Sequence, residues 1–181
     1  MTTAHADPAH PRTPPRSPSS LHIDSPGPED GPALWQLARE AKTLDVNSVY
    51  SYLLWCRDFA GTSAVARDRT GHVVGFVTGY VRPDAPATLL IWQISVAESV
   101  RGLGVAGALL DALSLRVATQ RGIDCLETTI TPGNVASERL FASYAERHGA
   151  QVKREVLFPA EQFPGSGHEP EVLHRIAPLS F

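Results

Sequence analysis

The sequence predicts an α/β (α+β) fold in which about four helices flank a mixed, mostly antiparallel central sheet of about seven strands. Three observations lead to this prediction. Segments with the two-residue repeat of strands alternate with segments of helical repeat along most of the chain. A loop of small residues, Arg101–Ala106, joins an apolar strand-like run to a long helix-like stretch. The 181 residues, 43% of them hydrophobic, suffice for one domain with a core and are too few for two of ordinary size.

The domain is expected to begin after a Pro/Ser-rich tail. Residues 1–20 combine Ser, Thr, Ala and His with five prolines, which are Pro8, Pro11, Pro14, Pro15 and Pro18. Such a composition buries too little apolar surface to offset the entropy that is lost on ordering the chain. We therefore expect residues 1–20 to be disordered and the folded domain to span residues 21–178.

The first elements of the domain are expected to be a strand and two helices. Leu21 and Ile23 indicate a short strand. Between residues 29 and 41 apolar side chains recur at helical spacing, on a face made of Leu34, Leu37, Ala38 and Ala41. Asn47 or Ser48 is suited to cap a second helix that reaches about Asp58, because either side chain can accept a bond from a first-turn amide.

Three strands follow these helices. Residues 63–67 and 73–80 are expected to form a hairpin around the turn at 68–71. A turn with two prolines, 82–86, then leads into the apolar strand 89–96.

The second half of the domain alternates helices and strands. The helix 106–121 is expected to direct one set of side chains inward, namely Ala106, Leu109, Leu110, Leu113 and Val117, and another outward, namely Asp111, Ser114 and Arg121. A strand at 125–130 follows. Asn134 is suited to cap a fourth helix with a buried face of Ala136, Leu140, Phe141 and Tyr144. Residues 152–157 and 172–176 are expected to be the closing strands.

The loop Arg101–Ala106 is suited to bind a pyrophosphate. Small residues between a strand and a helix leave backbone N–H groups exposed at the helix N-terminus, where the helix dipole adds positive potential. The pattern Arg-x-x-Gly-x-Ala in this loop resembles the coenzyme A loop of the GNAT superfamily of N-acetyltransferases, and the expected element order resembles the GNAT fold. A Rossmann dinucleotide site is the weaker alternative, because the spacing is not Gly-x-Gly-x-x-Gly.

The resemblance implies acetyl-CoA as co-substrate and indicates which residues contact it. In the superfamily the pantetheine arm lies along the strand before the loop, which here places it beside Ile94 and Val96. The amides that would hold the pyrophosphate are those near Arg101, Gly102, Leu103, Gly104 and Ala106. Asn134 matches the superfamily asparagine that lies close to the cofactor, and it can cap its helix at the same time.

Many further stretches resemble the diaminobutyrate acetyltransferases of ectoine biosynthesis. The resemblance covers about residues 21–178, and its matching segments are 44–54, 56–59, 75–80, 91–93, 127–132, 157–158, 163–164, 168–169 and 171–173. It implies acetyl transfer to the γ-amine of L-2,4-diaminobutyrate, which gives the precursor that a separate synthase cyclises to ectoine, a compatible solute made under osmotic stress. It also implies a homodimer.

Such an acceptor carries two ammonium groups and one carboxylate, so its site needs both anions and hydrogen-bond donors. The candidate anions are Asp45, Glu127, Glu169 and Glu171. The candidate donors are Asn47, Ser48 and the Trp92 indole. From these we expect the substrate-binding residues to be Asp45, Asn47, Trp92 and Glu171. Simpler roles stay open, with Asp45 as a helix cap, Trp92 in the core and Glu171 solvated.

The sequence indicates direct attack of the amine on the thioester within a ternary complex. Neither Cys56 nor Cys125 has a recognisable histidine partner that would make it a nucleophile. For a lysine-like pKa of about 10.4, neutralising the amine at pH 7 costs roughly 4–5 kcal/mol. A carboxylate acting through water can accept the proton, and the candidates for this catalytic role are Glu171, Asp45 and Glu127.

Many GNAT enzymes carry a tyrosine general acid seven residues after the helix-capping asparagine. Phe141 occupies that position in this chain. Tyr144 is a weak substitute, for which core packing is the other role. His168 is expected at a loop or the rim of the pocket.

Composition argues against several other classes of protein. The net charge of −3 gives no bulk attraction to nucleic acid. No apolar stretch approaches the roughly 18 residues that span a membrane, and the two isolated cysteines suit neither a disulfide framework nor a metal site. We therefore expect a cytoplasmic protein without a metal, and the resemblance implies that it is an enzyme with a small diamine substrate. The alternatives are a GNAT enzyme acting on another small amine or a protein N-terminus, and a non-catalytic acyl-CoA-binding module.

Overall fold

The computed structural model of the protein describes residues 21–164 and 167–181, so the tail expected at 1–20 lies outside the described residues. Seven strands form one sheet in the order β1-β2-β3-β4-β5-β7-β6. Only β4 and β5 pair in parallel, and every other neighbouring pair is antiparallel. The predicted element order and the mixed, mostly antiparallel sheet are confirmed.

The strands are β1 (His22–Asp24), β2 (Ala64–Arg67), β3 (Val73–Arg82), β4 (Ala85–Val96), β5 (Cys125–Ile130), β6 (Gln151–Phe158) and β7 (Glu171–Ala177). The helices are α1 (Gly31–Ala41), α2 (Val49–Asp58), α3 (Val105–Arg121) and α4 (Val135–Arg147). Short 3-10 turns lie at Pro28–Asp30, Ala60–Thr62, Glu98–Val100 and Ala160–Gln162.

Side-chain caps begin two of the helices. The Ser48 hydroxyl accepts a hydrogen bond from the Ser51 amide at 3.3 Å, so Ser48 and not Asn47 caps α2. The Asn134 side chain accepts from the Ser137 amide at 3.2 Å, as expected for the cap of α4. Each cap satisfies one of the first-turn amides that a helix leaves without an internal partner.

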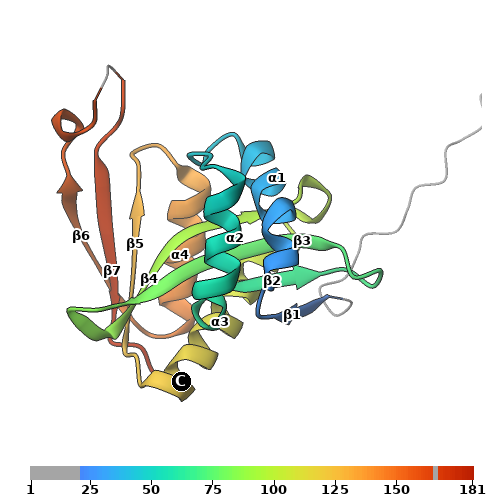
Figure 1. The fold of residues 1–181 in the computed structure, drawn as a ribbon. Helices are drawn as coiled ribbons and strands as arrows, with labels where there is room; N and C mark the ends of the chain where they lie inside the picture. Colours follow the sequence, from blue (N-terminus) through green and yellow to red (C-terminus); the bar gives the residue numbers. More distant parts are fainter. Residues whose placement is uncertain (1–20, 165–166) are drawn as a thin grey trace, which may run out of the picture.

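Helices cover both faces of the sheet, as Figure 1 shows. On one face α1 and α2 pack over β2 and β3, in a core cluster of Leu34, Leu37, Ala38, Tyr52, Cys56, Val65 and Phe76. On the other face α3 and α4 bury the larger core cluster, which includes Leu109, Leu110, Leu113, Val117, Leu126, Phe141, Tyr144 and Ile176. Adjacent residues Phe76 and Val77 of β3 belong to opposite clusters, because successive strand side chains point to opposite faces.

Several predicted side-chain directions are wrong. Ser114 is fully buried, because its hydroxyl donates to the Leu110 carbonyl at 2.7 Å and needs no water. Ala136 is exposed and borders a cavity described below. At the start of α3 the buried residue is Val105, and Ala106 is only half-buried.

The sheet opens between β4 and β5. These strands pair only where Thr88–Ile91 face Cys125–Thr128, although β4 continues to Val96. Among the described residues no strand pairs with the rest of β4 on that side. The two parallel strands therefore diverge. Beyond this point their backbone groups and side chains can line a cavity between them.

Candidate active site

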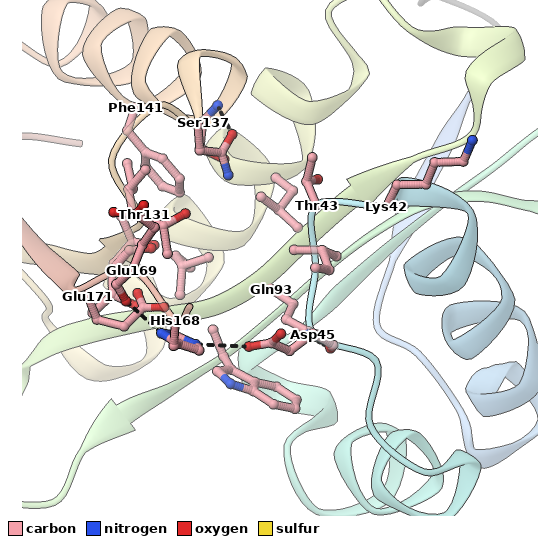
Figure 2. Close-up of a pocket in the computed structure, with 18 of the residues that line it drawn as sticks. Lys42, Thr43, Asp45, Gln93, Thr131, Ser137, Phe141, His168, Glu169 and Glu171 are labelled. Atoms are coloured by element: carbon pink, nitrogen blue, oxygen red, sulfur yellow. Dashed lines mark hydrogen bonds and ion pairs between the residues drawn. The ribbon is translucent and has the colours of Figure 1, made fainter. Parts of the chain in front are cut away.

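A cavity of about 520 Å³ lies where β4 and β5 diverge. Five segments form its walls, which are the loop between α1 and α2, β4, the end of β5, the N-terminal half of α4 with its cap, and the residues that lead into β7 (Figure 2). The structure brings together the residues expected to bind the acceptor, since the lining includes Asp45, Asn47, Trp92 and Glu171.

The lining carries more negative than positive charge. Its carboxylates are Asp45, Glu169 and Glu171, and its cationic or titratable partners are Lys42 and His168. The Asp45 side chain is 90% exposed, and its Oδ2 lies 3.9 Å from the Nε2 of His168 across the mouth (Figure 2). Glu171, at the start of β7, is half-buried in the wall. The cavity is therefore suited to a cationic ligand.

Aromatic rings form the wall beside α2. Trp92 is 36% exposed and stacks on Trp55 of α2, with ring centroids 4.6 Å apart and an interplanar angle of 17°. Trp55 also contacts Phe59 at 4.6 Å between centroids. Trp92 thus belongs to the cavity wall and not to either core cluster.

Glu127 lies outside this cavity, in contrast to the other two candidate bases. It is 1% exposed, and it accepts hydrogen bonds from Arg82 at 2.9 Å and from Arg175. Its position on β5 precedes the divergence, where the strand still pairs with Leu90 on one side and Arg175 on the other. Glu127 is a buried counter-ion of two arginines, and we do not retain it as a proton acceptor.

The loop before α3 has the geometry of an anion site. Gly102 and Gly104 adopt φ of 75° and 77°, and a Cβ on either would meet nothing within 4 Å, so the backbone is open to a ligand. The amides of Arg101 and Leu103 already donate to Glu98 at 3.2 Å and to Val100 at 3.3 Å. By the described hydrogen bonds, the amides left for a phosphate are therefore those of Gly102, Gly104 and the first turn of α3, which begins after Gly104.

A second cavity, of about 310 Å³, runs from this loop to the first cavity. Of the predicted cofactor residues it is lined by Ile94, Val96, Arg101, Ala106 and Asn134, whereas Gly102, Leu103 and Gly104 shape the loop without lining it. The two cavities share Thr43, Ile94, Asn134 and Ser137. A cofactor that lies along β4 can therefore present its reactive end to the acidic cavity.

The nucleophile and general-acid candidates are all inaccessible. Burial raises the pKa of Cys56 to about 12 and also raises that of Cys125, so neither thiol is a ready thiolate. Burial likewise raises the pKa of Tyr144 to about 12, and the residue lies in the core between α3, α4 and the sheet. Phe141, at the position of the expected tyrosine, does line the acidic cavity.

Sequence reasoning missed several lining residues, among them Gln93. Gln93 is 5% exposed, accepts a hydrogen bond from the Tyr52 hydroxyl at 3.0 Å, and donates to the Asp45 carbonyl at 2.8 Å. The available signal was a polar amide inside the apolar run of residues 89–96. Lys42, Thr128, Thr131 and Ser137 were missed as well, because their positions depend on how the strands diverge.

Comparison with known proteins identifies the family. Residues 31–145 match the model of the acetyltransferase (GNAT) family. The chain belongs to the GNAT acetyltransferase family. The L-2,4-diaminobutyric acid acetyltransferase of Streptomyces coelicolor is 61% identical over 180 residues, which cover 99% of this chain and 98% of that protein. The enzyme of the same name from Streptomyces avermitilis is 58% identical, with 99% of each chain covered.

A solved structure shares the GNAT fold closely. Diaminobutyrate acetyltransferase EctA from Paenibacillus lautus, in complex with its substrate L-2,4-diaminobutyric acid and coenzyme A, superposes with a TM-score of 0.83. It is 38% identical, and the match covers 89% of this chain and 96% of that chain.

As a GNAT family member the protein is an acetyl-CoA-dependent N-acetyltransferase. The open backbone at Gly102 and Gly104, and the cavity along β4, fit that co-substrate. Within the described residues no group of three or more His, Cys, Asp or Glu side chains is placed to hold a metal ion. No helix in the described part of the chain is long and apolar enough to cross a membrane.

Proposed function

We propose that the protein transfers the acetyl group of acetyl-CoA to the γ-amine of L-2,4-diaminobutyrate, giving N-γ-acetyldiaminobutyrate for ectoine biosynthesis. The observation that carries the proposal is the acidic cavity, with its three carboxylates, opening into the cavity beside the phosphate loop. Carboxylates complement the two ammonium groups of the acceptor, and the Asn47 amide and Trp92 indole can donate to its carboxylate. The Streptomyces relatives named for this activity, at 58% and 61% identity, support the choice of substrate.

The acetyl group passes directly from sulfur to nitrogen in a ternary complex. The neutral γ-amine attacks the thioester carbonyl, a C–N bond forms, the C–S bond breaks, and the nitrogen loses a proton. The thiolate of coenzyme A leaves readily, because a thiol pKa of about 8.5 lies close to neutral pH. The buried thiols of Cys56 and Cys125 support this route over an acyl-cysteine intermediate.

We assign proton removal to Glu171 and attraction of the ammonium group to Asp45. Glu171 is half-buried in the wall, whereas the Asp45 side chain is 90% exposed at the mouth. Glu171→Gln keeps the shape of the side chain and removes the proton acceptor, so we expect kcat to fall by about 10²–10⁴. The matched control is Glu155→Gln, at an exposed position of β6 outside both cavities. Equal kcat in the two variants would remove Glu171 from this role.

The substrate is tested by thiol release from acetyl-CoA with a panel of diaminobutyrate, ornithine, lysine, polyamines and peptides. We expect diaminobutyrate to give the highest kcat/KM, and fragment masses of the product to place the acetyl group on the γ-nitrogen. Rates on lysine or peptides that match those on diaminobutyrate would favour another GNAT acceptor. Binding of acetyl-CoA without any thiol release would favour a non-catalytic module. Parallel double-reciprocal lines would contradict direct transfer.

We further propose that the enzyme is a cytoplasmic homodimer. The edge strand β6 supports the dimer, since it exposes apolar side chains at its end, which are Val156, Leu157 and Phe158. Monomeric proteins rarely leave such an edge uncovered. Sedimentation at several concentrations tests the dimer, and Leu157→Lys should shift the equilibrium to monomer. Fractionation of cells that produce the protein tests the compartment.

A further inference from the structure

We infer that Tyr52 and Gln93 form a positioning relay that holds the backbone of Asp45 at the mouth of the acceptor cavity. The relay runs from α2, through β4, to the loop between α1 and α2. This inference rests on the proposed function, because it assigns the loop to acceptor binding.

Chemistry allows only one direction of hydrogen bonding along the relay. The Asp45 carbonyl can only accept, so the group of Gln93 that faces it at 2.8 Å must be the amide nitrogen. The amide oxygen of Gln93 then faces Tyr52, whose hydroxyl must donate to it at 3.0 Å. The nitrogen and the oxygen of the Gln93 amide therefore each have one possible role, and removal of the Tyr52 hydroxyl takes the donor away from the Gln93 oxygen.

Burial makes these bonds costly to break. Tyr52 is fully buried and packs edge-on against Phe76 with centroids 6.4 Å apart, and Gln93 is 5% exposed. The strand position of Gln93 is itself fixed, because Thr78 on β3 donates to its carbonyl at 3.4 Å. A buried acceptor that loses its donor carries a desolvation penalty that an exposed one avoids.

The other described contacts of Asp45 are long and exposed. Asn47 donates to the same Asp45 carbonyl at 3.4 Å, and His168 lies 3.9 Å from the Asp45 carboxylate. The Asp45 side chain is 90% exposed and does not pack against the fold. The Gln93 amide therefore links this loop to the sheet, and Tyr52, which also interacts with Asn47 of the loop, sets the orientation of that amide.

Tyr52→Phe removes the hydroxyl and keeps the ring. A typical hydrogen bond contributes about 0.5–1.5 kcal/mol net to stability. A free-energy difference of about 1.4 kcal/mol changes a dissociation constant tenfold. We expect KM for diaminobutyrate to rise by about three- to tenfold, with KM for acetyl-CoA and kcat within about twofold of wild type. The matched control is Tyr144→Phe, because Tyr144 is also fully buried but lies in the core on the other face of the sheet.

A second readout measures the loop itself and does not depend on activity. The chain has two lysines, Lys42 at the start of this loop and Lys153 on β6. A lysine-specific endoproteinase should cut after Lys42 about three- to tenfold faster in Tyr52→Phe, because cleavage tracks the open population of the loop. Cleavage of Tyr144→Phe should match wild type.

A mutant cycle completes the test. Gln93→Leu should also speed cleavage after Lys42, and adding Tyr52→Phe to it should have a smaller effect than Tyr52→Phe alone, because only the contact of Tyr52 with Asn47 then remains to be lost. Unchanged cleavage and unchanged diaminobutyrate KM in Tyr52→Phe would overturn the relay. A different outcome would be faster cleavage of Tyr52→Phe than of the wild type, in a protein whose wild type does not acetylate diaminobutyrate. That outcome would support the relay and refute the proposed function.

Discussion

Gly104→Ala tests the anion site at the start of α3. Gly104 caps the helix with φ of 77°, a conformation that costs an L-residue about 1–2 kcal/mol. For a domain of this size we expect the melting temperature to fall by about 2–8 °C. The added methyl group also enters open space beside the loop, where it meets no protein atom within 4 Å, so it takes up room that the phosphate site would use.

Loss of one amide bond to a charged ligand costs about 1.5–3 kcal/mol. At 1.4 kcal/mol per factor of ten, KM for acetyl-CoA should rise by roughly 10- to 100-fold. We expect KM for the amine to change little, because the acceptor cavity does not include the loop.

The same helix supplies the control. Gly122 caps the other end of α3 with φ of 68°, and a Cβ there also meets nothing within 4 Å. Gly122→Ala should lose similar stability without a change in acetyl-CoA affinity. Initial rates at varied acetyl-CoA, calorimetric titration of acetyl-CoA and thermal melts separate the two effects. Equal acetyl-CoA KM values in both variants would refute a phosphate site at the α3 N-terminus.

Three further predictions concern stability and accessibility. Asp30 is 4% exposed and pairs with Arg67 at 2.8 Å; burial raises its pKa, but the bonds from Arg67 and Gly27 outweigh burial and lower it. Asp30→Asn should therefore cost about 3 kcal/mol at neutral pH. Chemical denaturation should show this difference shrinking once the pH falls below the usual carboxyl pKa and disappearing below the lowered pKa of the folded state. Glu127→Gln should lower the melting temperature and leave kcat within about twofold, because Glu127 lies outside the cavity. Treatment of the native enzyme with a thiol-alkylating reagent should not reduce activity, and mass spectrometry should find Cys56 unmodified, because Cys56 is 1% exposed.

Local sequence patterns predict most of the fold because the elements have clear periods and ends. Strand β5 starts and ends where predicted, and the Asn134 cap forms as expected. Ser114 shows where the hydrophobic pattern fails. Its polarity predicts an exposed side chain, but its hydroxyl bonds to a carbonyl of its own helix, so the side chain can be buried.

The site is less predictable than the fold, because it depends on where two strands separate. Asp45, Trp92 and Glu171 converge although they are far apart in the sequence, and only the family resemblance indicated that they meet. Glu127 has the same side-chain chemistry as Glu171. It lies where β4 and β5 are still paired, however, and its carboxylate is bonded to two arginines. The sequence around Glu127 does not indicate that Arg82 on β3 and Arg175 on β7 are its partners.

The stacked indoles of Trp55 and Trp92 provide an intrinsic spectroscopic signal for ligand binding. One ring of the pair borders the space for the diamine, and the remaining tryptophan of the chain, Trp35, sits on α1 beside Arg39. Coupling between two parallel chromophores changes when either rotates, so entry of an amino acid should alter the ultraviolet circular dichroism without any added label. Substitution of Trp35 would leave that signal intact and lower its background.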